Sequence, residues 1–521
     1  MAKLRKPKSF TYEWYPMADL ITYAGIDCYV TSNLMQRLLP ALRARENYMF
    51  VRGGEQRVMP APSILSEQVN IKAKALEFVC DLEIAGIQYD IPGNRAMHER
   101  MVADIAETED KIFKALGFQV DLNSADALAD LLYNRMGFEC PIKTKHGGES
   151  TSGDALKALH EKYGHEWLEL IKRRNDVHAM HSNFIKTYIE DWVKSDGRVH
   201  PQYNLNGTSS HRLSSSNPNL LNLPRGYYGY DIRSLYKVSK GCVFITFDFS
   251  SCEVKILAAL SGDEKMIDAC RKGLDFHSFT ASMMYNIPYE EMVEAVEDKN
   301  NPNHKKYKGF RQGAKAVTFG LLYGSSVPGI AVNIGKTVEE TQVIVDTYFN
   351  MFPAVKTFIE DCHAMARANQ YVITPFAQRK MEYGAQEIFR GSAVYNASLR
   401  NSQNVSIQSP ASTLGLIVFS ELNRRMAKYG GRAICTVYDS IELEIPLEHA
   451  AEAINEGFYV MDDWPVEEFD WLTFAIGADG ELGWNWGDLA KVKPGITQEE
   501  CEVLLREMNE ELYYEALAVA A

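Results

Sequence analysis

Two aspartates lie inside strongly apolar stretches of the sequence. Asp248 ends the run CVFITFD (242–248), and Asp439 follows the run AICTVY (433–438). A buried carboxylate is costly without a partner, and Mg²⁺ is commonly held by one or two carboxylates together with substrate phosphates. Two such ions would activate a hydroxyl and stabilise the leaving oxygen of a phosphoryl transfer. The alternative is structural: Asp439 turns a β-hairpin and Asp248 caps the helix that follows.

A second set of residues recurs every four positions in RQGAKAVTFGLLYG (311–324). These residues are Arg311, Lys315, Phe319 and Tyr323. A helix turns by about 100° per residue, so each step of four drifts by only about 40° and the four share one face. Two cations followed by two aromatic rings suit a nucleoside triphosphate. The alternative is an amphipathic helix with a solvated basic end and a packed aromatic end.

Two polar segments add candidates for nucleic-acid contacts. In LRNSQNVSIQS (399–409), Arg400, Asn404 and Gln408 lie four apart on one helical face. Long polar side chains in a row can contact phosphates or groove edges, although a solvated helix face has the same pattern. The turn-rich segment TSSHRLSSSNPNLLNLP (208–224) places Arg212 among small hydroxyls. Taken alone, such a loop is common.

The elements that would position these residues form an irregular mixture of helices and strands. The sequence predicts a strand over 242–250 and a hairpin from AICTVYD and IELEIP. Helical patterns cover about 66–190, 263–370 and 400–430. The stretch RGGEQRVMPAPS (52–63) is interpreted as a linker because of its Pro and Gly. Strands and helices that interleave in this way indicate a mixed α/β fold.

Composition limits the function only loosely. At 521 residues the chain has room for about three domains. It has no run of roughly 20 apolar residues and no apolar signal core, so we expect no membrane association and a cytoplasmic location. Nine scattered cysteines without a C-x-x-C pair indicate reduced thiols. A net charge of −14 argues against DNA binding by bulk charge but says little about local patches.

Together the segments resemble family A DNA polymerases, the DNA polymerase I-like group that includes many bacteriophage replicases. DFSSCEVKILAALSGD (248–263) resembles motif A, D-Y-S-Q-I-E-L-R-x-L-A-x-L-S-x-D, and residues 311–324 fit motif B, R-x-x-x-K-x-x-x-F/Y-G-x-x-Y-G. VYDSIELE (437–444) stands where motif C, V-H-D-E, belongs. Residues 208–224 resemble T-x-T-G-R-L-S-S-x-x-P-N-L-Q-N-I-P, and DFHSFTA (275–281) resembles D-I-H-x-x-T-A. The resemblance covers about residues 66–487.

For catalysis, the resemblance implies that Asp248 and Asp439 hold two Mg²⁺ ions with the Phe249 carbonyl as a further ligand. The primer 3′-hydroxyl would attack the α-phosphate of a dNTP, and pyrophosphate would leave. Lys315 would neutralise developing charge on the triphosphate, together with Arg311.

The resemblance also implies the remaining contacts with nucleotide and DNA. The dNTP site would add His277 on the triphosphate, Phe319 on the sugar and base, Tyr323 near the templating base, and Glu253 as the steric gate against a ribose 2′-hydroxyl. Five residues would contact primer-template DNA: Arg212, Arg400, Asn404, Gln408 and Tyr438. The hydrogen-bond acceptors of the DNA minor groove are nearly alike for every correct base pair, so such contacts need not depend on sequence.

Several positions depart from the family pattern. Motif C has Tyr438 in place of histidine and Ser440 in place of glutamate. A serine there also resembles the single-subunit phage RNA polymerases, whereas Glu253 and Phe319 favour the DNA enzyme. Two alternatives therefore stay open: a DNA-dependent RNA polymerase, and a catalytically silent protein that only binds DNA. The presence of both Asp248 and Asp439 argues against the silent protein.

The N-terminus holds a second resemblance. YAGID (23–27) resembles the Y-x-x-x-D end of a 3′–5′ proofreading exonuclease, with Tyr23 and Asp27 one helical turn apart. The other carboxylates of that site have no counterpart here, so we expect a truncated exonuclease remnant and no proofreading by this chain alone. The missing half could be a separate exonuclease subunit docked on residues 1–50. The alternative is that Tyr23 and Asp27 are ordinary packing and surface residues.

The expected architecture is a right-hand polymerase with an antiparallel palm sheet. The predicted divisions are an exonuclease-like remnant and linker (1–65), thumb region (66–240), palm (241–262 and 371–487), fingers (263–370) and a C-terminal helical extension (488–521). An apolar face on the C-terminal helix would pack on the palm or dock a partner such as a processivity factor. The expected role is DNA replication by a phage enzyme, in the host cytoplasm if it is phage-encoded.

Overall fold

The computed structural model describes residues 17–43, 47–60, 71–144 and 146–520. Its centre is a curled sheet in the order β11-β12-β8-β13-β7-β3-β4, with β14 paired to β13, and every pairing in it is antiparallel. The strands of this sheet are β3 (Ile87–Tyr89), β4 (Arg198–Val199), β7 (Tyr236–Lys237), β8 (Cys242–Phe249), β11 (Arg432–Val437), β12 (Ser440–Pro446), β13 (Ala478–Asn485) and β14 (Asp488–Val492). The mixed α/β fold predicted from the sequence is confirmed.

Three strands of this sheet come from residues 87–237, which the sequence analysis assigned to the thumb region. The division into thumb, palm and fingers therefore does not follow the limits of the sheet, and the predicted boundaries stay a prediction. Three two-stranded sheets lie apart from the central one: β1 (Asn47–Arg52) with β2 (Glu55–Pro60), β5 (Gln202–Asn204) with β6 (Ser214–Ser216), and β9 (Tyr371–Ile373) with β10 (Arg379–Met381).

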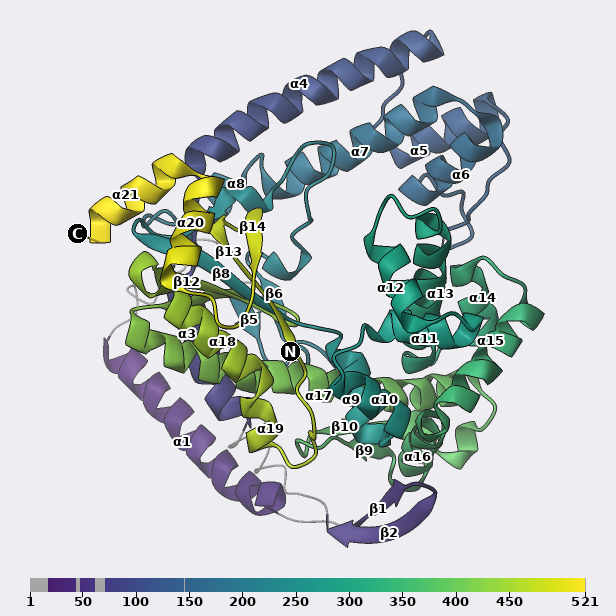
Figure 1. Ribbon diagram of the computed structural model, residues 1–521, viewed down its shortest axis with the longest axis vertical. Coiled ribbons are helices and arrows are strands. Elements are labelled where there is room, and N and C mark those ends of the chain that lie inside the picture. Colours follow the sequence, from purple (N-terminus) through teal and green to yellow (C-terminus); the bar gives the residue numbers. More distant parts are fainter. Residues whose placement is uncertain (1–16, 44–46, 61–70, 145, 521) are drawn as a thin grey trace.

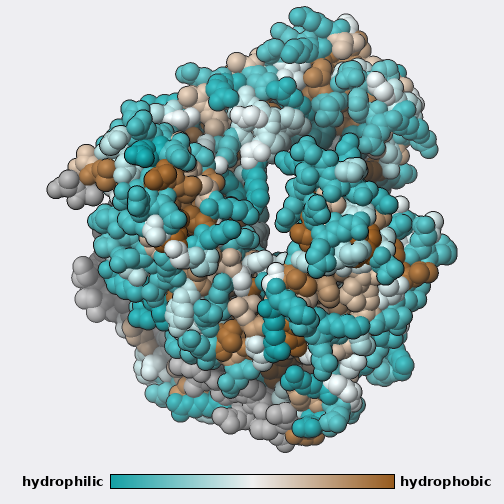
Figure 2. Space-filling model, in the orientation of Figure 1, coloured by the Kyte–Doolittle hydropathy of each residue, from teal (hydrophilic) through white to brown (hydrophobic). Residues whose placement is uncertain are grey.

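Two groups of helices extend from the sheet, one toward the top of the view and one toward its right (Figure 1). The first group arches away from the sheet and returns: α4 (Ile91–Leu116), α5 (Ala125–Ala129), α6 (Gly153–Tyr163), α7 (Glu166–Phe184) and α8 (Tyr188–Trp192). The second group consists of α9 (Cys252–Ser261), α10 (Glu264–Arg271), α11 (Phe276–Tyr285), α12 (Tyr289–Glu297), α13 (His304–Leu322), α14 (Val327–Ile334), α15 (Val338–Met351) and α16 (Pro353–Asn369). The space-filling view shows an opening between the two groups, bordered largely by hydrophilic residues (Figure 2).

The remaining helices complete the framework: α1 (Met17–Arg43), α3 (Ala73–Ala85), α17 (Ala393–Met426), α18 (Ala450–Asp462), α19 (Trp464–Glu468), α20 (Gln498–Met508) and α21 (Glu510–Ala520). The largest apolar core lies between the sheet and helices α9, α17 and α18. Strand β8 supplies Val243, Ile245 and Phe247 to it, all fully buried. Burying such side chains is the main source of stability, and here it fixes the strand that ends at Asp248.

The segment interpreted as a linker is a β-hairpin. Strands β1 and β2 pair in register around Gly53-Gly54, both with positive φ, as a two-residue hairpin turn requires. The amides of both glycines donate to the carboxylate of Asp361 on α16, at 2.7 and 3.1 Å. The linker interpretation is wrong for residues 52–60, because Gly53 and Gly54 form the tight turn of a hairpin. Residues 61–63 lie outside the described part.

The C-terminal extension packs on the main apolar core. It is two helices, α20 and α21, with Asn509 between them. A capping box begins α20, since Thr497 accepts from the Glu500 amide and Glu500 accepts from the Thr497 amide. Cys501 and Leu505 belong to the main core. The packing interpretation of this apolar face is thus confirmed.

Helix α1 carries the segment that resembles an exonuclease end. The side chains of Tyr23 and Asp27 lie outside the described residues, so their interpretation stays a prediction. Within the described part of the chain, no helix combines the length and the apolar character that crossing a membrane requires.

Candidate active site

Pairing of β8 with β12 brings the two predicted metal-binding aspartates together. Ser440 lies opposite Asp248 in the register, so Asp439 sits at the adjoining end of the β11–β12 turn. The Phe249 amide donates to the Asp439 carbonyl at 3.0 Å. Asp439 is therefore both a hairpin-turn residue and a neighbour of Asp248, and the two interpretations of it are compatible. Tyr438 shares the turn at φ 59°.

Both carboxylates are largely buried, and at Asp248 the burial is poorly compensated. Burial, then the charges of Asp439 and Asp479, raise the pKa of Asp248 to about 7. Burial also raises the pKa of Asp439. Asp248 Oδ1 is buried without a hydrogen-bond partner. Uncompensated carboxylates of this kind fit a divalent cation.

This part of the site does not enclose a metal by itself. Among the described residues, no group of three or more His, Cys, Asp and Glu side chains is arranged to hold an ion. Mg²⁺ typically keeps several waters and takes one or two carboxylates plus substrate phosphates, so two carboxylates suffice for a site that substrate completes. The Phe249 carbonyl as a further ligand stays a prediction.

Helix α13 presents the predicted cationic and aromatic face. The Lys315 ammonium lies 5.7 Å from the centre of the Phe319 ring, and the Phe319 and Tyr323 rings lie 5.7 Å apart. Tyr323 is the first residue beyond the helix. The spacing of four thus produces the expected face. Lys315 is exposed, so its ammonium is available to a ligand.

Arg311, the first residue of that face, is held by a carboxylate that sequence reasoning did not assign to the site. Its guanidinium donates two hydrogen bonds to Asp275, at 2.7 and 2.9 Å. Burial alone would raise the pKa of Asp275, but hydrogen bonds from Arg311 and Ser278 outweigh it and lower the pKa to about 2. Asp275 stands first in the quoted DFHSFTA segment, which was the available signal.

His277 lies on α11 behind this face. It is 3% exposed, and its ring centre is 5.6 Å from that of Phe319. Burial lowers its pKa to about 4, so the imidazole is neutral at neutral pH. Its Nδ1 is buried without a hydrogen-bond partner. A neutral histidine can still donate one hydrogen bond to a phosphate oxygen.

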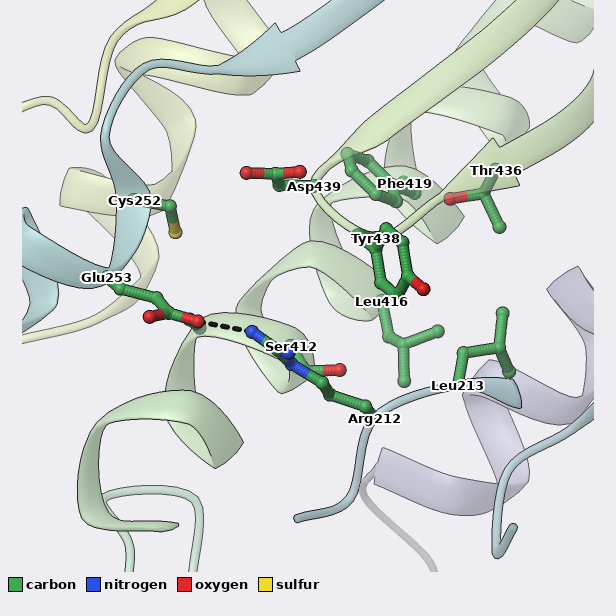
Figure 3. A pocket seen from close by; sticks show the side chains of 11 residues that line it. Arg212, Leu213, Cys252, Glu253, Ser412, Leu416, Phe419, Thr436, Tyr438 and Asp439 are labelled. Atoms are coloured by element: carbon green, nitrogen blue, oxygen red, sulfur yellow. Dashed lines mark hydrogen bonds and ion pairs between the residues drawn. The ribbon is translucent and has the colours of Figure 1, made fainter. Parts of the chain in front are cut away.

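A hydrogen-bonded cluster joins the 208–224 loop, α9 and the end of α13. Glu253 accepts from Arg212 on one carboxylate oxygen and from the Tyr323 hydroxyl, at 2.7 Å, on the other. Figure 3 shows the Arg212–Glu253 pair facing Tyr438 and Asp439 around a cavity of about 70 Å³. The predicted gate and the predicted minor-groove arginine are therefore neighbours.

Helix α17 places the three predicted DNA contacts along its exposed and half-buried side. Gln408 hydrogen-bonds the side chain of Tyr323, and Arg400 lies against Gly324, where an added Cβ would come within 2.8 Å of it. Asn404 is half-buried, with an Oδ1 that lacks a partner. Gln408 and Arg400 therefore lie beside the end of α13.

His211, beside Arg212, anchors the loop and was not predicted to be a site residue. Its Nδ1 lies 2.9 Å from Ser409 Oγ on α17, and Ser409 donates to Gln378 at 2.9 Å. Because the serine hydrogen is used, His211 is the donor in the first bond. His211 has φ 59°, a conformation that glycine adopts freely and where the family pattern has glycine.

Three further carboxylates near Asp248 escaped sequence reasoning. Asp479 is opposite Asp248 across β13, Glu481 is opposite Thr246, and Glu442 is opposite Thr246 across β12. Their positions depend on the register of strands that are distant in sequence. Period-two alternation within DSIELE and DGELG was the only available signal.

Comparisons with known proteins agree with this geometry. The profile described as "DNA polymerase family A" matches residues 93–488. The thermostable DNA polymerase I of Thermus aquaticus is 32% identical over 386 residues, covering 73% of this chain and 44% of that protein. DNA polymerase I of Chloroflexus aurantiacus is 27% identical, covering 94% of this chain and 49% of that protein. The chain thus spans about half the length of these relatives.

A solved structure is similar as well. It is the polymerase domain of Pol1 from M. smegmatis in complex with DNA primer-template and dNTP, with a TM-score of 0.71 and 26% identity, covering 81% of this chain and 71% of that one. The chain belongs to DNA polymerase family A, and its fold is that of a right-hand polymerase. The relatives named here are bacterial.

Proposed function

We propose that this chain is a DNA-directed DNA polymerase that extends a primer 3′ end with dNTPs. The observation that supports the proposal is the junction of β8 with the β11–β12 turn, where Asp248 and Asp439 lie at the same end of the sheet and Asp248 Oδ1 has no hydrogen-bond partner. The M. smegmatis relative, with its primer-template and dNTP, supports the same substrates here. The opening in Figure 2 offers a passage for the duplex.

Asp248 and Asp439 would hold two Mg²⁺ ions, which supply activation of the primer 3′-hydroxyl and stabilisation of the leaving oxygen. Lys315 binds the triphosphate, since its ammonium is exposed on α13. Arg311 adds a bidentate donor for phosphate oxygens, oriented by Asp275 until the nucleotide arrives. His277 donates a neutral hydrogen bond.

The cluster around Glu253 discriminates dNTPs from rNTPs. Its carboxylate is fixed between Arg212 and Tyr323, so it cannot swing away from a ribose 2′-hydroxyl without breaking two hydrogen bonds. Phe319 packs on the nucleotide's sugar and base. Arg212, Gln408 and Tyr438 contact the primer terminus, while Arg400 and Asn404 hold the duplex along α17.

In this proposal residues 66–240 act as the thumb region, 263–370 as the fingers, and 241–262 together with 371–487 as the palm. A role in phage DNA replication remains part of this proposal.

The test is extension of a labelled primer-template by the purified chain with Mg²⁺, using dNTPs or rNTPs, beside Asp439→Ala. The proposal expects extension with dNTPs only and loss of extension in the variant. Equal use of rNTPs would favour an RNA polymerase. DNA binding without extension would favour the catalytically silent protein.

A further inference from the structure

The residue after Asp439 is Ser440, where the motif C pattern has glutamate. Ser440 Oγ lies 3.1 Å from the Val437 carbonyl and 2.8 Å from Glu442 Oε1. The Thr436 hydroxyl donates to the Ser440 carbonyl at 2.7 Å. Side chains from both strands therefore close the turn that carries Tyr438 and Asp439.

Glu442 points to the same side of the sheet as Asp248. Ser440 pairs with Asp248 and Glu442 with Thr246, and residues directly opposite each other in an antiparallel ladder share a face. Glu442 is 1% exposed, and its Oε2 has no hydrogen-bond partner. An unpartnered buried carboxyl oxygen is costly, so a purely structural reason for keeping glutamate here is weak.

The single hydrogen of the Ser440 hydroxyl links the protonation of Glu442 to the turn. The Ser440 hydroxyl has one hydrogen and two acceptors within reach. If it donates to Val437, Glu442 must donate to Ser440 Oγ as a carboxylic acid; if it donates to Glu442, the bond to Val437 is lost. Burial raises the pKa of Glu442 to about 7, so the neutral form that satisfies both contacts is accessible.

We propose that Ser440 and Glu442 act as one positioning unit that replaces the carboxylate of motif C, with Glu442 fixing the Asp439 turn through the Ser440 hydroxyl. Compared with the motif C pattern, the acidic residue stands two positions further along β12 and lies on the same face of the sheet as Asp248. Glu442 is a positioning residue, because it acts on Asp439 through its hydrogen bond with Ser440 and not by contact with substrate. This inference rests on the proposed polymerase function.

The test compares Glu442→Gln, Glu442→Leu, Ser440→Ala and the Ser440→Ala,Glu442→Leu double variant. Each is assayed for single-nucleotide incorporation (kcat and the KM for dNTP) and for Mn²⁺ binding to the free protein. Gln keeps a donor for Ser440, so Glu442→Gln should stay within about threefold of the parent. Glu442→Leu should lower kcat about tenfold at little-changed KM and weaken Mn²⁺ binding severalfold. Because the two residues act together, the double variant should lose no more than the worse single variant.

Two further variants separate positioning from stability. Glu444→Gln removes another buried carboxylate on β12, one that is paired with Arg198 and Arg432, so it should lower the melting temperature without changing kcat or Mn²⁺ affinity. Ser440→Glu,Glu442→Leu returns the carboxylate to the motif C position and should recover most of the activity lost in Glu442→Leu.

The proposal is overturned if Glu442→Leu keeps the parent's kcat and Mn²⁺ affinity, if Glu442→Gln is as impaired as Glu442→Leu, or if the losses of Ser440→Ala and Glu442→Leu add. A parent chain that does not extend primers contradicts the polymerase function instead. In that case Mn²⁺ binding still decides on the positioning unit.

Discussion

Carboxylates lie at two ends of the candidate active site, and folding shifts their pKa values in opposite directions. Asp248 and Asp439 on the sheet have raised pKa values, and Asp248 has an oxygen without a partner. Asp275 beside α13 is paired with Arg311, and its pKa is lowered to about 2. The sheet end therefore has carboxylates whose charge a metal can neutralise, whereas the carboxylate at the α11–α13 end is already paired with a cation.

This difference shows at which end of the site the binding of cations and substrate would change the balance of charge. On the sheet, folding alone leaves like charges together, which is unfavourable until cations arrive. Between α11 and α13, folding holds a guanidinium at a fixed place, which would lower the cost of ordering it when a triphosphate binds. Changes at the sheet should thus affect the chemical step, and changes at Asp275 should affect nucleotide affinity.

The largest effect is expected from Asp248→Asn, which removes one of the two uncompensated charges. Incorporation at saturating dNTP should fall by about 10³-fold or more, because groups that stabilise charge in the transition state carry most of the rate. Single-turnover primer extension measures this. The melting temperature should hold or rise, since the charge repulsion is relieved. A variant with near-parental rates would show that Asp248 is not needed for metal binding.

The next prediction concerns pH and the metal-free protein. The pKa of Asp248, raised from 3.8 to about 7, means that the folded state binds the proton more tightly than the unfolded state. The resulting stability is present below about pH 4 and is lost as pH rises to about 7. In EDTA, the melting temperature should therefore fall across this window more steeply in the parent than in Asp248→Asn. Equal slopes would contradict the assignment.

Asp275→Asn should have a smaller effect, on affinity instead of rate. Asparagine keeps the cap on the Ser278 amide but loses the ion pair, so Arg311 is less well oriented. The KM for dNTP should rise about three- to tenfold, with kcat within about twofold. Steady-state kinetics checks this, and Arg311→Lys is the matched control. A lower KM would mean that Asp275 competes with the triphosphate instead of orienting Arg311.

The smallest effect is expected at the loop anchor, His211→Gly. Glycine relieves the positive φ but removes the bond to Ser409, so stability should change little. Affinity for primer-template should weaken by about two- to threefold as Arg212 loses its anchor, which a fluorescence-anisotropy titration detects. Burial lowers the pKa of His211 to about 4, so the parent's affinity should show no inflection near pH 6.5 from this residue.

The parts of the site that could be predicted from the sequence are those that depend on local spacing. The α13 face depends on local helical spacing, so Arg311 to Tyr323 could be placed from residue numbers alone. The β11–β12 hairpin was likewise local. Glu442 and Asp479 enter the site through strand register, and Asp275 through packing of α11 on α13. Those contacts join distant segments, which a single sequence does not specify.

The hairpin at residues 47–60 marks another limit. Gly-Gly between two runs of strand-forming residues is a hairpin signal, but it is also common in linkers. What decides between them is a distant partner, Asp361 on α16, which accepts both glycine amides. Pairing Gly53 and Gly54 with a carboxylate some 300 residues away has no local signature.

The central claim is that the uncompensated carboxylates at the sheet hold the ions that serve polymerisation. The most direct measurement is Mn²⁺ binding, followed by electron paramagnetic resonance, to the complex with a 3′-dideoxy-terminated primer-template, for the parent and for Asp248→Asn,Asp439→Asn. The account predicts that the parent binds Mn²⁺ at a site that is lost in the double variant while DNA affinity is retained. Identical Mn²⁺ titrations for the two proteins would contradict it.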